Sequence, residues 1–117
     1  MIESEKFKEL AESWKAATDQ VLNCQEINRK DLSDLFRDTY VLIKTYSTET
    51  MIPRALYQVL WEMNDFHQWV IHSEKTPIFF LRQEIISLVI DLNYFVVRGW
   101  ANELDIQYQI LKIEGAI

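Results

Sequence analysis

The chain has 117 residues and a formal net charge of −6 at pH 7. Such an acidic surface repels nucleic-acid phosphates and anionic lipid, so direct binding to nucleic acid or to a membrane is not expected. The length and the hydrophobic share of 49% predict one globular domain, residues 1–117. Two glycines and two prolines are too few for the turns of an all-β fold, so an all-α class is predicted.

The single cysteine, Cys24, excludes an internal disulfide and is consistent with a reducing compartment. The N-terminal residues are charged, with no apolar run typical of a signal peptide. The most apolar stretch, Ile78 to Trp100, is interrupted by charged side chains, which disfavours a membrane span. A cytoplasmic location is therefore predicted.

Apolar side chains that recur every three or four residues predict four amphipathic helices. They span about residues 3–24, 29–46, 53–72 and 77–98. Asn28 is the expected N-cap of the second helix and Thr76 that of the fourth, while Pro53 suits the first turn of the third. The short connections predict an antiparallel four-helix bundle.

The tail from Trp100 to Ile117 fits two structures. The spacing of Leu104, Tyr108 and Leu111 is typical of a helix, whereas the alternation around Tyr108 is typical of a strand. A helix is favoured because a single strand would lack a partner strand. The expected architecture is thus a four-helix bundle with a short C-terminal helix, or a strand, added to it.

The predicted fourth helix is apolar on two sides, which is typical of a helix that is buried all round. One row is Leu81, Ile85, Leu88, Leu92 and Phe95, and a second row is Phe79, Ile86, Ile90 and Val97. This helix is either the centre of the domain or part of a subunit interface. The second alternative predicts a homodimer formed through the fourth helix.

The sequence contains no glycine-rich phosphate loop, no paired-cysteine motif and no nucleophile elbow. His67 falls on the core side of the third helix, where a hydrogen-bonded buried histidine is expected. Glu84 and Asp91 are two turns apart on the fourth helix, and a structural ion pair is favoured over acid–base chemistry. No catalytic residue, metal or cofactor is predicted. The least favoured hypothesis is an enzyme that uses Glu62, Glu84, Asp91 or His67.

Two surfaces are candidates for binding a partner. The first is an acidic row on the second helix, formed by Asp31, Asp34 and Asp38, which could instead be a solvated face. The second is an aromatic ridge on the non-core side of the third helix. It contains Trp61 and Asp65, with Tyr57 and Trp69 on its flanks. The alternative for the ridge is that its tryptophans pack into a second internal cluster.

Small size, acidity and helicity together predict a module that binds a basic protein partner. In this overall profile the chain resembles some bacterial immunity and antitoxin proteins, and the resemblance implies an inhibitor that blocks the active cleft of a basic toxin or nuclease. The alternative is a structural or scaffolding subunit that associates with itself.

Overall fold

The computed structural model describes the backbone of residues 2–117 and the side chains from residue 5 onward. Five α-helices and one 3₁₀ segment account for the regular structure of these residues, and they include no strand. The elements are α1 (Ile2–Leu22), α2 (Arg29–Thr45), α3 (Arg54–His72), the 3₁₀ segment η1 (Pro77–Leu81), α4 (Arg82–Arg98) and α5 (Glu103–Glu114). The predicted all-α class is confirmed.

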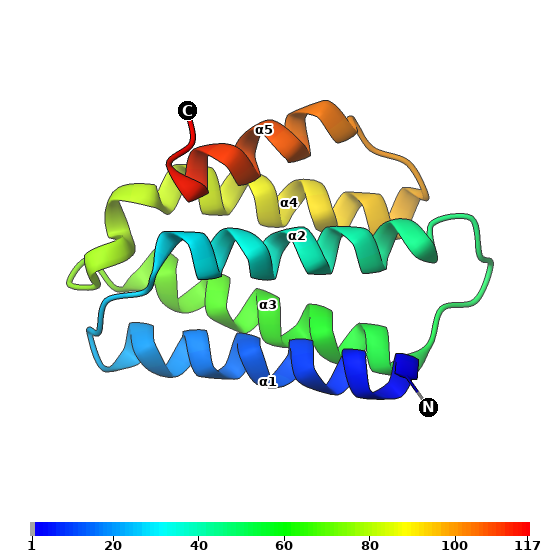
Figure 1. The fold of residues 1–117 in the computed structure, drawn as a ribbon, viewed down its shortest axis with the longest axis horizontal. Coiled ribbons are helices and arrows are strands. Elements are labelled where there is room, and N and C mark those ends of the chain that lie inside the picture. The colour runs from blue at the N-terminus through cyan, green and yellow to red at the C-terminus, as the bar shows by residue number, and fades with distance from the viewer. Residues whose placement is uncertain (1) are drawn as a thin grey trace.

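Each α-helix runs opposite to the one before it, yet the packing differs from the predicted bundle (Figure 1). The most extensive contact joins α1 to α3, which run in the same direction (Figure 1). Next in extent are the contacts of α5 with α2 and with α4. Around the molecule the packed order is α1, α3, α4, α5, α2, so the predicted antiparallel four-helix arrangement with an appended tail is not confirmed.

Two helix ends differ slightly from the prediction. The first helix ends at Leu22, because Cys24 adopts a left-handed backbone conformation with φ of 53°. Pro53 lies just before α3 in an extended conformation and is not part of its first turn. The predicted N-cap of α2 is confirmed, since the Asn28 side chain accepts the Asp31 backbone N–H at 3.0 Å.

The predicted fourth helix is divided into η1 and α4. Thr76 precedes η1 in an extended conformation, but its side chain makes no capping hydrogen bond, and its buried Oγ1 has no partner among the residues that the structure describes. The Phe79 N–H instead donates to the Thr76 carbonyl at 3.0 Å. Thr76 is thus the N-cap residue, as predicted, but the tight 3₁₀ turn closes through the main chain and the side chain supplies no cap.

The tail forms a helix, which confirms the favoured alternative. The Asn102 side chain accepts the Asp105 N–H at its start, and Ile106, Ile110 and Ile113 are buried at helical spacing. At its end the Arg29 side chain donates from Nε to the Ile113 carbonyl at 2.9 Å and from a terminal nitrogen to the Lys112 carbonyl at 2.8 Å. A cation from α2 thus satisfies carbonyls that a helix C-terminus leaves unpaired.

The opposite end of α5 is attached to α2 by Glu103. Its carboxylate accepts a hydrogen bond from the Tyr40 hydroxyl and pairs with the Lys44 ammonium at 3.0 Å. These hydrogen bonds, that of Tyr40 first, lower the pKa of Glu103. Burial, followed by the hydrogen bond to Glu103, raises the pKa of Tyr40. With both ends fastened, α5 is an integral part of the packed body.

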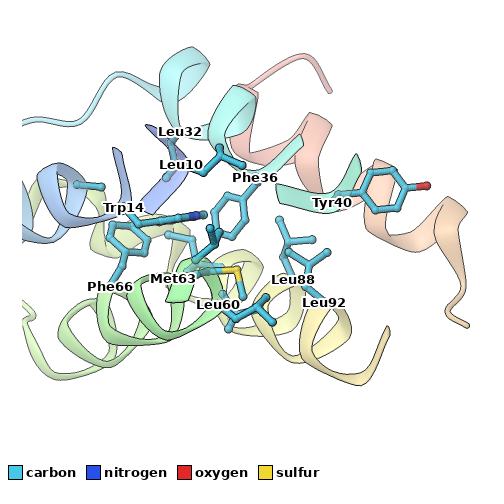
Figure 2. Close-up of a cluster of buried hydrophobic side chains, with 14 of the residues drawn as sticks. Leu10, Trp14, Leu32, Phe36, Tyr40, Leu60, Met63, Phe66, Leu88 and Leu92 are labelled. Atoms are coloured by element: carbon cyan, nitrogen blue, oxygen red, sulfur yellow. The ribbon is translucent and has the colours of Figure 1, made fainter. Parts of the chain in front are cut away.

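The centre of the core is Trp14, which has no exposed surface (Figure 2). Its ring lies between Phe36 of α2 and Phe66 of α3, with centroid distances of 4.9 and 5.2 Å. Its Nε1 donates to the buried Thr39 hydroxyl at 3.1 Å. One side chain therefore joins the first three helices and also finds a partner for its polar atom.

The two apolar rows of the fourth helix have different environments. The first row is buried, as predicted, but the second faces outward. The exposed fraction is 43% for Ile90 and 82% for Val97, while Phe79 and Ile86 are partly buried. The helix is therefore not central, because no other described element of the chain covers its second side.

Gly99 ends α4 with φ of +78°, and a Cβ placed there would lie 2.8 Å from the Ser47 carbonyl oxygen. We expect Gly99→Ala to lower the free energy of unfolding by more than about 2 kcal/mol, because left-handed strain adds to a clash with rigid backbone. Gly115→Ala is the matched control. It has a similar φ of +88°, but its Cβ would meet only the Arg29 side chain, at 3.3 Å. Equal losses in urea unfolding would contradict the proposed clash.

Candidate partner-binding surfaces

A groove of about 440 Å³ runs between α1 and α2. Its α1 side carries short side chains, Ser13, Ala16 and Ala17, which explains why a hollow remains between the two helices. The whole predicted acidic row lines the α2 side, namely Asp31, Asp34 and Asp38. The partly buried side chains of Ile27 and Leu35 supply apolar surface within it. The acidic row is thus one wall of a concave surface.

The opposite wall adds a carboxylate that sequence reasoning missed, that of Glu9 on α1. Lys6 is the one basic residue among the described residues that line the groove. Glu9, Asp31 and Asp38 lie in no ion pair within the described residues, and all three are exposed. The described lining has four carboxylates and one ammonium group, so the groove as a whole is negative, and most of that charge comes from α2.

Asp34 differs from its two neighbours in the acidic row because basic side chains already hold it. The ammonium group of Lys30 lies 2.9 Å from its carboxylate and the Arg37 guanidinium lies 3.0 Å away. Both basic residues also reach Glu114 of α5. The hydrogen bonds to Asp34 and then Glu114 raise the pKa of Lys30. Asp34 therefore shares its two basic partners with Glu114 of α5, and its charge is largely compensated.

The aromatic ridge of α3 is exposed, which excludes the predicted alternative of a second internal cluster. The exposed fraction is 56% for Tyr57, 74% for Trp61 and 42% for Trp69, and Asp65 is exposed beside them. At 100° per residue, Tyr57 and Trp69 are roughly 120° apart around the helix axis. The four residues therefore spread over the outer side of α3 and form no single pocket.

The two predicted surfaces are not brought together. The groove lies between α1 and α2. The aromatic ridge lies on the side of α3 that faces away from its contacts with α1 and α4. The α1–α2 contact and the α3–α4 contact are not adjacent. The α1–α3 contact lies between them on one side, and α5 lies between them on the other (Figure 1). One small binding element cannot contact both, so they are separate candidate sites.

The carboxylates considered for acid–base chemistry have structural partners. Glu84 lies 3.8 Å from the Lys112 ammonium, and Asp91 accepts a hydrogen bond from the Gln109 side chain at 2.9 Å. Both contacts fasten α5 to α4. The described part of the chain contains no group of three His, Cys, Asp or Glu side chains arranged to hold a metal ion.

His67 is buried as predicted, but the predicted hydrogen bonding is incomplete because Nε2 has no partner among the described residues. Burial lowers its pKa below the ordinary value of 6.5. As the pH falls below 6.5, the unfolded chain binds a proton at this position that the folded chain does not, so stability is lost.

We therefore expect His67→Leu to flatten the decline in stability on the acid side of pH 6.5, since leucine removes the group that titrates differently in the two states. Urea unfolding of the wild type and the variant at several pH values measures this. The difference in free energy of unfolding between variant and wild type at pH 8 is the reference. As the pH falls, this difference should shift in favour of the variant. A difference that stays constant with pH would contradict the account.

Comparison with known proteins gave no match to any family model, curated protein or solved structure. None of the described helices combines the length and the apolar character needed to cross a membrane.

Proposed function

We propose that this chain is an acidic inhibitor protein whose α1–α2 groove binds a basic protein partner, as immunity and antitoxin proteins bind basic toxins or nucleases. The observation that carries the proposal is the groove itself. Carboxylates stand on both of its walls, and short or apolar side chains form the surface between them. A merely solvated acidic helix face would have neither a carboxylate on an opposing helix nor a hollow beside it.

This combination suits lysine and arginine side chains. Their long aliphatic stems lie against apolar surface while their charged heads reach acceptors at the edge. Leu35 and Ile27 offer that apolar surface, and Glu9, Asp31 and Asp38 offer the acceptors. The short side chains of Ser13 and Ala16 leave room for the partner's backbone to approach α1. A basic helix or loop projecting from the partner is the element that fits.

Inhibition follows if that basic element is the one that holds phosphate in the partner's active cleft. The carboxylates then pair with the side chains that would otherwise bind nucleic acid, and the 14.0 kDa domain blocks the entrance. The aromatic ridge of α3 is not part of this site, because it lies on another face. The negative net charge accelerates the encounter with a basic partner at low salt.

The test has two stages. The tagged chain is used to capture proteins from its native host at low and at high ionic strength, and the purified partner's own activity is then titrated with the chain. We expect the chain to capture one basic protein and to capture less of it at high salt. The partner's activity should fall to zero when one equivalent of the chain has been added. Capture without any loss of the partner's activity would reject inhibition, and capture insensitive to salt would reject the acidic groove.

A further inference from the structure

The α1–α2 groove has the length of an ordinary helix. Its lining runs along α1 from Lys6 to Gln20, which is about 21 Å at the rise of an α-helix. Ser13 and Ala17 line it one turn apart, with Ala16 beside them. Packed helices lie about 8–10 Å apart, and the shorter distances need small side chains at the contact. A helix of about 14 residues, a common length in proteins, can therefore lie close against α1 along the whole groove.

Three carboxylates of the groove lie in no ion pair within the described residues, and they follow one another along its length. Asp31 and Asp38 are seven residues apart on α2, a rise of about 10.5 Å. The two helices run in opposite directions, and the hydrogen bond from Trp14 to Thr39 sets their register (Figure 1). From the N-terminal end of α1, Glu9 therefore comes first, then Asp38, then Asp31.

The spacing of Asp31 and Asp38 matches a helix better than an extended segment. A helix that lies along α2 presents side chains on one side at i and i+7, with the same rise of about 10.5 Å. In an extended segment, side chains on one side recur about every 6.7 Å, so they fall at about 6.7 and 13.4 Å. Two basic side chains of a helix therefore stand directly opposite both carboxylates, whereas those of an extended loop do not.

Asp34, which lies between these two carboxylates, adds little to the charge of the groove. Lys30 and Arg37 hold its carboxylate, and both also reach Glu114 of α5. Neither basic side chain is among the described residues that line the groove. On the α2 wall, the acceptors that are open to a partner are therefore two helical turns apart.

Lys6 gives the groove a direction. It lines the end nearest the α1 N-terminus and is in no ion pair within the described residues. The last carbonyls of a helix lack partners and carry partial negative charge, so a lysine stabilises a helix C-terminus beside it. The first N–H groups of a helix carry the opposite charge and suit the other end of the groove, where Asp31 lies.

We infer that the element bound in the groove is a basic α-helix of the partner that runs antiparallel to α1. Two of its Lys or Arg side chains, seven residues apart, pair with Asp31 and Asp38, and a further one reaches Glu9. Between these cations the helix faces Leu35 and Ala17, which favours short apolar side chains there. The inference rests on the proposed function, because it specifies which element of the basic partner enters the same groove.

Synthetic peptides test the inference without the partner. The probe is an alanine-rich peptide of about 18 residues with three lysines on one side of the helix, two of them seven residues apart. One control has the same composition with its lysines distributed around the helix, and a second has two central prolines, which break the helix. In chemical-shift titrations the probe should bind at least about tenfold more tightly than either control. Equal affinities, or no binding by any of the three peptides, would overturn the inference.

Two isosteric substitutions in the acidic row test the assigned spacing. Asp38→Asn should weaken binding of the probe at least about fivefold, because it removes an unpaired acceptor. Asp34→Asn is the matched control and should stay within about twofold of the wild type, because Lys30 and Arg37 already compensate that carboxylate. Circular dichroism would verify that both variants fold. Equal losses would contradict the assignment of Asp31 and Asp38 as the paired contacts.

Spin labels on the probe test its direction. A nitroxide on the C-terminus of the peptide should broaden the amide signals around Lys6 and Glu9, and one on its N-terminus those around Gln20 and Asp31. The reverse pattern would overturn the inferred direction.

The peptide results can be distinguished from a failure of the proposed function. A partner that is captured and inhibited, while the probe and its controls bind alike, would reject the helix and leave the inhibitor proposal intact. Binding of the probe in the inferred direction, without any loss of the partner's activity, would reject inhibition alone.

Discussion

Replacing Trp14 by alanine is expected to lower the free energy of unfolding by about 3–5 kcal/mol. The indole is fully buried and contacts the rings of Phe36 and Phe66 (Figure 2). Its removal loses the transfer free energy, leaves a cavity between three helices and breaks the hydrogen bond to Thr39. Because domains have a total stability of about 5–15 kcal/mol, this one change could remove half of it.

Urea unfolding followed by circular dichroism measures this loss as a lower midpoint at a similar slope. Trp61→Ala is the matched control, since it deletes the same side chain from a position that is 74% exposed. It should change the stability by less than about 0.5 kcal/mol when measured at a concentration where the chain is monomeric. Comparable losses in the two variants would show that Trp14 is not the centre of the core.

Reversing one charge on each wall of the groove, with Glu9→Lys and Asp38→Lys together, should weaken partner binding about 100-fold. Each reversal replaces an attraction by a repulsion in a concave site, and two such changes amount to about 3 kcal/mol. Isothermal titration of the captured partner measures the affinity. The affinity should also become much less sensitive to salt, because fewer favourable charge pairs remain to be screened.

The control for this variant alters the same total charge elsewhere. Glu49→Lys with Glu74→Lys changes two exposed carboxylates in the loops that flank α3, away from the groove. It should retain affinity within a few-fold of the wild type. If both double variants weaken binding equally, the net charge of the chain governs the affinity and the groove does not.

The helices and most of the core could be predicted from the sequence because they depend on local order. Trp14 belongs to a series of apolar residues spaced three or four apart along α1. Asn28 stands just before α2, and its side chain bonds to a backbone N–H only three residues away. The division of the fourth helix could not be predicted. Thr76 and Pro77 are followed by a run of apolar residues, and this pattern suits the start of an α-helix and a 3₁₀ turn equally well.

The candidate site could be predicted only in part, because a groove depends on two helices. Periodicity placed Asp31, Asp34 and Asp38 on one side of α2, but the distance to α1 depends on how extensively α1 packs against α3. The sequence therefore did not indicate that Glu9 lies on the opposite wall of the groove. The helical pattern likewise placed Trp61 off the core side, yet only the packing shows that no other helix covers it.

Chemical-shift mapping tests the central claim most directly, since a chain of 14.0 kDa gives well-resolved amide spectra. The labelled chain would be titrated with its basic partner. The account predicts that the largest shifts follow both walls of the groove, from Glu9 to Ala16 on α1 and from Asp31 to Asp38 on α2. Shifts centred on Trp61 and Val97, with the groove unaffected, would contradict it.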